Sequence, residues 1–412
     1  MFKPTPIQLI IIVCGVEIFS MLGSATFPAL LPTFIETWSM SKTDAGWVTG
    51  FYYAGYLVAV PFLVSLTDRV SPRLILTVCM ILTAFSTLGF ALLVDGFWSA
   101  TVFRVMGGIG LAGTYMPGLK LLNDHLEHLA PGSDHSRSVA FYTSSFGIGT
   151  ALSYFMAGEI AAVHDWQQVF LVASGGPITA LIMIYALLPR RDPRPHKAPD
   201  THVLDFRPVL RCRAAMGYVF AYTVHNFELF AFRSWVVTFL FFAASTHPGQ
   251  TMLLSATAIA ALVNLLGLPA SVLGNEMARR IGRHRTITII MLSSATLACI
   301  LGFNADAPFW VVMILVMLYG VTITGESSSV TAGVVSVAPQ GYRGATMAVH
   351  SCIGFIGSFA GPLLFGVMLD LTSPTGIGGD TVASWGWAFA FSGAIVALGP
   401  LALAVLREDK AG

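Results

Sequence analysis

The sequence has little charge for its length. Only 10% of its 412 residues are Asp, Glu, Lys or Arg, whereas 55% are hydrophobic and the mean hydropathy is +0.75. A soluble domain carries roughly 25% charged residues, so this chain cannot cover its surface with charge. We therefore expect a lipid bilayer to surround it. The net charge of +1 gives no reason to expect nucleic acid as a partner.

Several kinds of chemistry are also missing. The five cysteines are an odd number at wide spacings, in or beside apolar runs, which is neither a disulfide framework nor a zinc pattern. No GxxxxGKS/T loop is present, which argues against an ATP-driven pump. We found no catalytic constellation, so we expect a protein that is not an enzyme and uses no cofactor and no metal.

The chain has long apolar runs instead. A membrane-spanning helix needs about 20 mostly apolar residues, and twelve stretches meet this requirement. The first run has no polar cleavage region after a short apolar core, so it is expected to be retained as a span. We predict an all-α integral membrane protein with spans at 7–31, 45–66, 74–94, 98–122, 139–163, 167–188, 214–243, 251–273, 286–304, 308–334, 345–369 and 385–406.

The positive residues sort the loops between these spans into two sets. An even number of spans puts both termini on one side, and the loops of that side carry 18 of the 22 Lys and Arg residues. The opposite loops hold only Lys42. Positively charged loops stay in the cytoplasm, so we predict an inner-membrane protein with both termini cytoplasmic.

The two halves of the chain resemble each other. Matching segments are separated by 211, 212 or 208 residues, which is close to half the chain length. Two parallel six-helix halves are a known transporter design, and one chain that supplies both can act as a monomer. We predict bundles at 1–188 and 214–412, joined by a cytoplasmic linker at 189–213. The matching segments are VEIF at 16–19 with FELF at 227–230, FW at 97–98 with FW at 309–310, and APGSDHSRS at 130–138 with APQGYRGAT at 338–346.

With twelve spans and an internal repeat, the whole chain resembles the major facilitator superfamily. That family carries a Gly, an Asp-Arg pair, a second Gly and basic residues in the loop between spans two and three. Asp68, Arg69 and Arg73 match this pattern, and Arg283 matches a basic position in the second half, but Val64 replaces the first Gly. The resemblance implies that these four matching residues belong to gating loops that assist the rocking of the two halves.

Charged residues inside the predicted spans are costly, at about 2.5–3.5 kcal/mol each at the bilayer centre. The chain keeps Glu17, Arg104, Glu228, Arg233 and Glu326 there. They lie in spans one, four, seven and ten, which line the central cavity in the family that the chain resembles. Spans three, six, nine and twelve have no charge at that depth. This segregation is typical of a polar transport pathway.

Two of these carboxyl groups, Glu17 and Glu228, occupy equivalent places in the repeat. A carboxyl group in an apolar setting can take up and release a proton, and a histidine can pass one on. We therefore treat Glu17, Glu228, His225 and His350 as proton-coupling candidates. The alternative interpretation of Glu17 is that it pairs with Arg104 and only holds spans one and four together.

The arginines indicate the second role. A guanidinium group can hold a carboxylate with two parallel hydrogen bonds, and tyrosine hydroxyls on the cavity spans can donate to a ligand. The predicted substrate-binding residues are Arg104, Arg233, Tyr115, Tyr222 and Glu326.

The sequence thus favours a secondary active transporter that moves a small, anionic organic solute by alternating access, coupled to protons. A proton-driven efflux pump for amphipathic or cationic compounds is the alternative, because membrane carboxyl groups together with many Phe, Met and Tyr residues suit such cargo as well. A receptor or membrane scaffold is a third class, and the lack of a sizeable soluble domain argues against it. Neutralising Arg233 distinguishes the first two, since anion binding requires this charge and cation binding does not.

Overall fold

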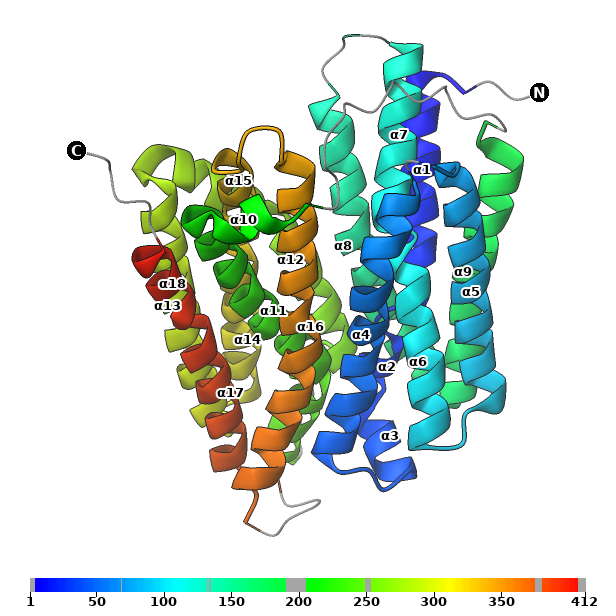
Figure 1. Ribbon diagram of the computed structural model, residues 1–412. Helices are drawn as coiled ribbons and strands as arrows, with labels where there is room; N and C mark the ends of the chain where they lie inside the picture. The colour runs from blue at the N-terminus through cyan, green and yellow to red at the C-terminus, as the bar shows by residue number, and fades with distance from the viewer. Residues whose placement is uncertain are drawn as a thin grey trace. The chain divides into compact units, whose positions relative to one another are not determined.

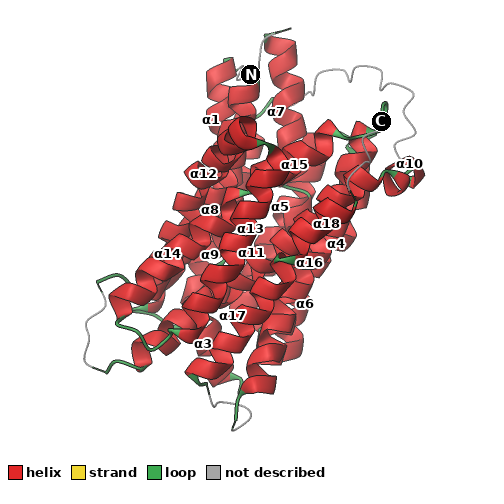
Figure 2. Cartoon of the chain, turned by 90° about the vertical axis from the view of Figure 1, so that its left-hand side faces the viewer, coloured by secondary structure: helices red, strands yellow, loops and turns green. Residues whose placement is uncertain are grey.

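The computed structural model describes residues 4–67, 69–130, 132, 135–189, 205–248, 253–374 and 380–406. In these ranges the regular structure is helical and includes no strand (Figure 2). Every predicted span coincides with helix, and nine helical segments of the described chain are long and apolar enough to cross a membrane by themselves. The other three predicted spans coincide with α4 (Lys42–Leu66), with α6 (Phe97–Ala112) followed by α7 (Tyr115–Leu129), and with α8 (Ser136–Ala161). The all-α membrane class is confirmed, and the number of twelve crossings stays a prediction.

The chain divides into two compact units. Unit 1 comprises Met1–Leu30 and Phe51–Pro199, and unit 2 comprises Leu31–Gly50 and Asp200–Gly412, so that α4 begins in unit 2 and continues in unit 1. The predicted linker at 189–213 lies largely outside the described residues.

In unit 1, α5 packs against both α6 and α9, and α1 packs against α8 and α9 (Figure 1). The apolar core of this unit gathers side chains from α1, α5, α7, α8 and α9, among them Leu9, Met80, Leu122 and Ile184. Besides α6, α7, α8 and most of α4, unit 1 contains α1 (Pro6–Ser20), the 3-10 helix η1 (Met21–Gly23), α2 (Thr26–Ala29), α5 (Pro72–Leu93) and α9 (Trp166–Leu187).

In unit 2, the long helix α11 is the element around which the others pack. It contacts α14, α15, α16, α17 and α18, and 78% of its most apolar stretch is buried, compared with 39–50% for the other eight candidate spans of the described chain. The elements of unit 2 are α3 (Leu31–Thr37), the start of α4, α10 (Arg207–Arg211), α11 (Arg213–Ser245), α12 (Ala256–Ile281), α13 (Arg283–Phe303), α14 (Phe309–Gly325), α15 (Ser327–Ser336), α16 (Arg343–Thr372), α17 (Val382–Val396) and α18 (Leu398–Val405).

Local signals explain where several helices begin. Thr5 caps α1 reciprocally with Gln8, and Pro6 follows at the first helical position, where its missing N–H is not needed. Ser255 accepts a hydrogen bond from the Ala258 N–H at 3.1 Å and so caps the start of α12. These caps satisfy backbone donors that would otherwise lack partners at a helix end.

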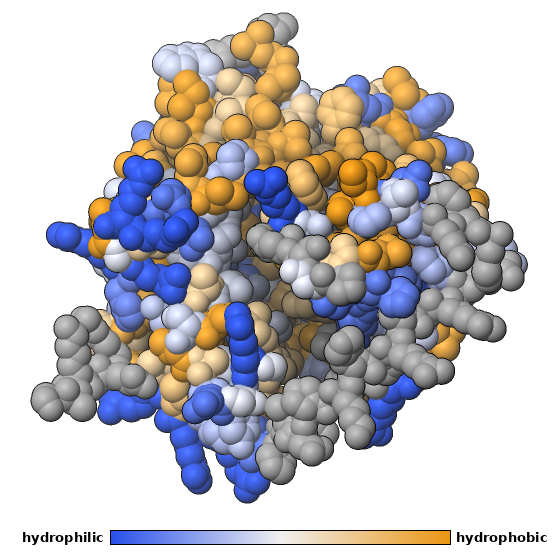
Figure 3. Space-filling view, turned by 90° about the horizontal axis from the view of Figure 1, so that it is seen from above, coloured by the Kyte–Doolittle hydropathy of each residue, from blue (hydrophilic) through white to orange (hydrophobic). Residues whose placement is uncertain are grey.

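The outer surface is apolar where a soluble protein would be charged. Trp98, Tyr185 and Phe62 are 79%, 73% and 72% exposed, and many other large apolar side chains are exposed with them. The end of the molecule seen from above the view of Figure 1 differs, because many hydrophilic side chains gather there among apolar ones (Figure 3). Extended apolar exposure of this kind matches the hydrocarbon core of a bilayer.

Candidate functional site in each unit

Glu17 lies near the end of α1 in unit 1 and is buried, with 1% of its surface exposed. The Tyr142 hydroxyl, from α8, donates to Glu17 Oε2 at 3.1 Å and also lies 3.0 Å from the Tyr115 carbonyl oxygen. Glu17 Oε1 is buried without a hydrogen-bond partner. The alternative in which Glu17 pairs with Arg104 does not occur in the described chain, where tyrosine holds this carboxyl group instead.

Tyr115, predicted to bind substrate, begins α7 beside this carboxyl site. Its ring stacks on the Tyr142 ring with the centroids 5.5 Å apart, and its hydroxyl donates to Thr143 Oγ1 at 3.2 Å. The structure therefore brings Tyr115 into the surroundings of Glu17.

Arg104 lies in the middle of α6 and is also buried, with 3% of its surface exposed. Its guanidinium carbon lies 4.0 Å from the centroid of the Tyr52 ring and 5.3 Å from that of Phe27. Aromatic faces attract a cation in this geometry. The guanidinium Nε and Nη2 atoms have no hydrogen-bond partner.

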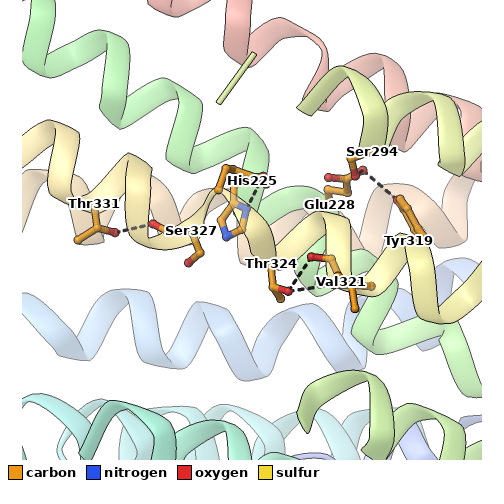
Figure 4. Close-up of polar contacts among 10 residues, drawn as sticks. His225, Glu228, Ser294, Tyr319, Val321, Thr324, Ser327 and Thr331 are labelled. Atoms are coloured by element: carbon orange, nitrogen blue, oxygen red, sulfur yellow. Dashed lines mark hydrogen bonds and ion pairs between the residues drawn. The ribbon is translucent and has the colours of Figure 1, made fainter. Parts of the chain in front are cut away.

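In unit 2, His225 and Glu326 form a buried pair. His225 Nδ1 lies 2.9 Å from Glu326 Oε1, and each side chain is 1% exposed or less. Glu326 sits where α14 ends at Gly325 and α15 begins at Ser327, so this helix break places its side chain against α11. Figure 4 shows His225 on α11 next to this break.

Glu228 is one helical turn further along α11 and is completely buried. Its Oε1 atom accepts hydrogen bonds from Ser294 Oγ at 2.7 Å and from the Tyr319 hydroxyl at 3.0 Å (Figure 4). Glu228 and Glu326 are also close enough for their charges to interact. The two carboxyl groups and His225 therefore form one buried ionisable cluster in unit 2.

An aromatic stack extends this cluster. The Tyr222 ring stacks on the His350 ring at 3.9 Å between centroids and on the His225 ring at 5.9 Å. Neither ring nitrogen of His350 has a hydrogen-bond partner. The structure thus gathers the two predicted histidines and Tyr222 at one place.

Arg233 lies five residues beyond Glu228 on the same helix. It is half-buried on α11, and its guanidinium carbon lies 5.6 Å from the centroid of the Phe230 ring. Its charge is therefore less enclosed than that of Arg104.

Of the predicted gating residues, Asp68 lies outside the described residues. Arg69 is exposed. Arg73 Nη2 donates to the Ile184 carbonyl oxygen at 2.9 Å, near the end of α9. Arg283 Nη1 donates to the Ala332 carbonyl oxygen and to Ser336 Oγ, each at 3.3 Å, in the second half of α15. A cation near the last carbonyl groups of a helix is a favourable arrangement.

Sequence reasoning missed the groups that hold the carboxyl side chains. Tyr142 and Ser294 come from predicted spans five and nine, outside the predicted cavity helices, and Tyr319 lies on span ten but was not selected among its residues. One signal was available, because the 208-residue repeat offset pairs Tyr142 with His350. No group of three His, Cys, Asp or Glu side chains in the described chain could hold a metal ion.

These features define an all-helical integral membrane protein that buries ionisable groups in both of its units. The chain belongs to the Major Facilitator Superfamily, whose profile matches residues 13–362 and 229–412. The relatives and structural neighbours described next are transporters, which are not enzymes.

Three relatives differ in how much of the chain they match. The Hexuronate transporter of Bacillus subtilis (strain 168) is 22% identical over 428 residues, covering 99% of this chain and 95% of that protein. The Probable sphingolipid transporter spinster homolog 2 of Arabidopsis thaliana is 26% identical over 132 residues, 32% of this chain, so the match spans about a quarter (26%) of that relative. The Quinolone resistance protein NorA of Staphylococcus aureus is 24% identical over 173 residues, 42% of each protein.

A solved structure with the same fold is the inward-facing and occupied conformation of a bacterial homologue of the human lysosomal transporter Spinster. Its TM-score is 0.75 at 15% identity, and the match covers 98% of this chain and 96% of that one. At this identity the likeness shows the fold alone.

Proposed function

We propose that the protein is a secondary active transporter that moves a small organic anion by alternating access, with protons as the coupling ion. The observation that carries the proposal is the pair of repeat-equivalent carboxyl groups, Glu17 and Glu228. Each is buried, each accepts a hydrogen bond from a tyrosine, and neither pairs with Lys or Arg in the described chain. A buried carboxylate without a cationic partner is costly, so proton binding is the simplest way to neutralise each one.

The cluster of unit 2 supports a proton route through more than one residue. His225 contacts Glu326, whose charge can interact with that of Glu228, and Tyr222 stacks between the two histidines. We therefore propose that Glu326 works with His225 and His350 in proton coupling, in addition to the substrate role expected from the sequence. A charge in a membrane span that neighbours other ionisable groups is typical of a proton relay.

The anionic cargo is supported by Arg233 and by one relative. Arg233 is the less enclosed of the two intramembrane arginines, and its fork of N–H donors suits a carboxylate. The relative that matches almost the whole chain is named a hexuronate transporter, and a hexuronate carries a carboxylate. We propose that Arg233 holds such a group, with Tyr115 and Tyr222 contributing contacts.

The remaining features of the cycle follow from the family. We propose that bundles 1–188 and 214–412 rock about the linker 189–213, with Asp68, Arg69, Arg73 and Arg283 as gating residues. The positive loops support cytoplasmic termini in the inner membrane, and a monomer suffices.

The test is uptake of radiolabelled glucuronate into liposomes that contain the purified protein. An inward proton gradient is expected to drive accumulation. Glu228→Gln is expected to reduce this gradient-driven accumulation at least ten-fold. Exchange of internal for external glucuronate should continue, because the variant loses the proton site and keeps the substrate site. Arg233→Gln is expected to lose both. Glu159→Gln, which removes an exposed carboxyl group of α8, is the matched control and should behave as wild type.

Gradient-independent uptake in the wild type, or full anion uptake by Arg233→Gln, would contradict the proposal. The alternative, proton-driven efflux of amphipathic cations, is favoured by the buried carboxyl groups beside aromatic rings and by the partial match to a quinolone resistance protein. Ethidium efflux that persists in Arg233→Gln, together with no glucuronate transport by the wild type, would support that alternative.

A further inference from the structure

The first span of unit 1 is interrupted, and a small cavity lies at the interruption. α1 ends at Ser20, one turn of 3-10 helix follows, and α2 starts only at Thr26. The cavity has a volume of about 20 Å³, which is room for little more than one water-sized particle. It is lined by residues of unit 1 only: Ser20, Gly23, Ser24, Tyr52, Thr83, Ser86, Thr87, Phe90, Phe103, Arg104, Gly107 and Phe170.

Arg104 contributes the charge of this cavity. Its Nε and Nη2 groups, two strong donors, are buried and have no hydrogen-bond partner. The hydroxyl of Ser24, another lining residue, is likewise buried without a partner. Other lining hydroxyls are already used, since Ser86 donates to the Phe103 carbonyl oxygen at 2.6 Å and Thr83 to that of Cys79 at 2.9 Å.

No acidic side chain of the described chain forms an ion pair with Arg104. The titratable side chains that interact with it are Tyr52, Tyr53 and Tyr154, and the Tyr52 ring covers the guanidinium group. A buried cation without a counter-charge is strongly unfavourable, and Arg cannot shed its proton to escape this. A water molecule could accept hydrogen bonds in the cavity, but it would leave the positive charge of Arg104 uncompensated.

We propose that this cavity binds one small inorganic anion of about the size of chloride, held by Arg104 Nε and Nη2 and by the Ser24 hydroxyl. Its volume is too small for an organic solute, so this anion is distinct from the cargo proposed for Arg233. The anion neutralises Arg104 inside unit 1 and joins the interrupted first span to α6. The site does not depend on which solute is transported.

The test measures binding of radioactive chloride to the purified full-length protein and its thermal unfolding midpoint as chloride replaces gluconate at constant ionic strength. A ligand that binds the folded state raises the midpoint in a saturable way. We expect saturable binding of one chloride per chain, and a midpoint that rises with chloride and with bromide. Arg104→Gln is expected to lose both responses, and Arg233→Gln, the matched removal of the other intramembrane arginine, is expected to keep them.

A second variant keeps the arginine, in case Arg104→Gln does not fold. A Cβ added at Gly107 would lie 2.9 Å from Ser86 Oγ and 3.2 Å from Tyr52 Cε2, so Gly107→Ala fills part of the cavity. We expect it to weaken chloride binding at least ten-fold. No saturable chloride binding by the wild type, wild-type binding by Gly107→Ala or Arg104→Gln, or loss of binding in Arg233→Gln would each overturn the proposal. Glucuronate uptake, measured separately, tests the proposed function and not this site.

Discussion

Helix α1 of unit 1 and helix α11 of unit 2 come from equivalent parts of the repeat and are built differently. α1 stops three residues after Glu17, whereas α11 continues for 17 residues beyond Glu228. The repeat offset of 211 residues pairs Ser24, at the break of unit 1, with Trp235 in unit 2. Trp235 is fully buried. Its ring stacks on that of Phe365 with the centroids 5.9 Å apart and makes an edge-to-face contact with that of Trp385 at 6.3 Å.

The residue that is equivalent to Arg104 in the second repeat shows the same contrast. The offset of 212 residues pairs it with Val316, which is fully buried. The place that is polar and hollow in unit 1 is therefore apolar and filled in unit 2. The two units therefore share a repeated helical framework but differ in the side chains that lie between the helices.

The carboxyl sites differ in the opposite sense. Glu17 has one side-chain donor, Tyr142, whereas Glu228 has two donors and a second carboxyl group, Glu326, nearby. Unit 2 thus contains the larger cluster of ionisable groups, and unit 1 contains the buried arginine that has no acidic partner in the described chain. The buried ionisable groups are therefore unevenly distributed between the two units.

The largest effect is expected when the buried aromatic side chain of Trp235 is removed from unit 2. Trp235→Ala empties a fully buried site and breaks the hydrogen bond from Trp235 Nε1 to the Pro362 carbonyl oxygen, which is 2.9 Å long. We expect a loss of about 3–5 kcal/mol in the free energy of unfolding, measured by chemical unfolding in detergent.

The repeat-equivalent control is Ser24→Ala in unit 1. It removes a hydroxyl that makes no hydrogen bond in the described chain, so we expect a change of no more than about 0.5 kcal/mol in chloride-free buffer. Equal losses in the two variants would mean that the two sites are packed alike, against the contrast drawn above.

A smaller effect is expected at the start of α4, which is capped by a carboxylate of unit 2. The equivalent position in unit 1 has no carboxylate. The Asp370 carboxylate, on α16, accepts hydrogen bonds from the backbone N–H groups of Lys42 and Thr43 at 3.2 and 2.7 Å. The 208-residue offset pairs Asp370 with Ala162, which cannot cap a helix. Asp370→Ala is expected to lower the free energy of unfolding by about 0.5–2 kcal/mol.

The control for this variant is Asp380→Ala. It removes only the ion pair of Lys42 Nζ with Asp380 Oδ2, 3.1 Å long and partly exposed, for which about 0.2–1 kcal/mol is expected. A larger loss in Asp380→Ala than in Asp370→Ala would show that the ion pair, and not the cap, stabilises the start of α4.

The sequence predicted the helical framework well, because apolar length is a local property. It did not predict the interruptions within spans. The stretch 7–31 reads as one apolar run, yet the helix changes at Met21 and again at Thr26. Gly23 and Ser24 are weak helix formers, but such residues are common in membrane helices, so their presence alone does not mark a break.

The candidate site was predictable in part for a similar reason. A charge in an apolar run is conspicuous, so Glu17, Glu228 and Glu326 were identified from the sequence. Their partners are ordinary tyrosines and serines on other helices, and only the packing of those helices brings them within hydrogen-bond distance. The pairing of His225 with Glu326 joins residues 101 positions apart, which no local pattern can indicate.

The tyrosines that hold the two carboxyl groups allow a finer test. Tyr142→Phe leaves Glu17 without a side-chain donor, whereas Tyr319→Phe leaves Glu228 with Ser294. A buried hydrogen bond contributes about 0.5–1.5 kcal/mol, and we expect Tyr142→Phe to be the more destabilising of the two in chemical unfolding. The reverse order would indicate that the cluster of unit 2 depends on every one of its donors.

The smallest effect is expected at the surface, where the two units should behave alike. Lys120 Nζ lies 3.5 Å from Asp124 Oδ2 on α7, and Arg280 Nε lies 3.5 Å from Glu276 Oε1 on α12, each pair four residues apart and partly exposed. Such pairs contribute about 0.3–0.5 kcal/mol and are screened by salt. Lys120→Gln and Arg280→Gln should therefore lower the free energy of unfolding by similar small amounts that shrink further at high salt. The expectation would be wrong if Lys120→Gln alone strongly lowered the free energy of unfolding, or if this variant lost glucuronate uptake. Either result would show that the two units differ at their surfaces as well as in their interiors.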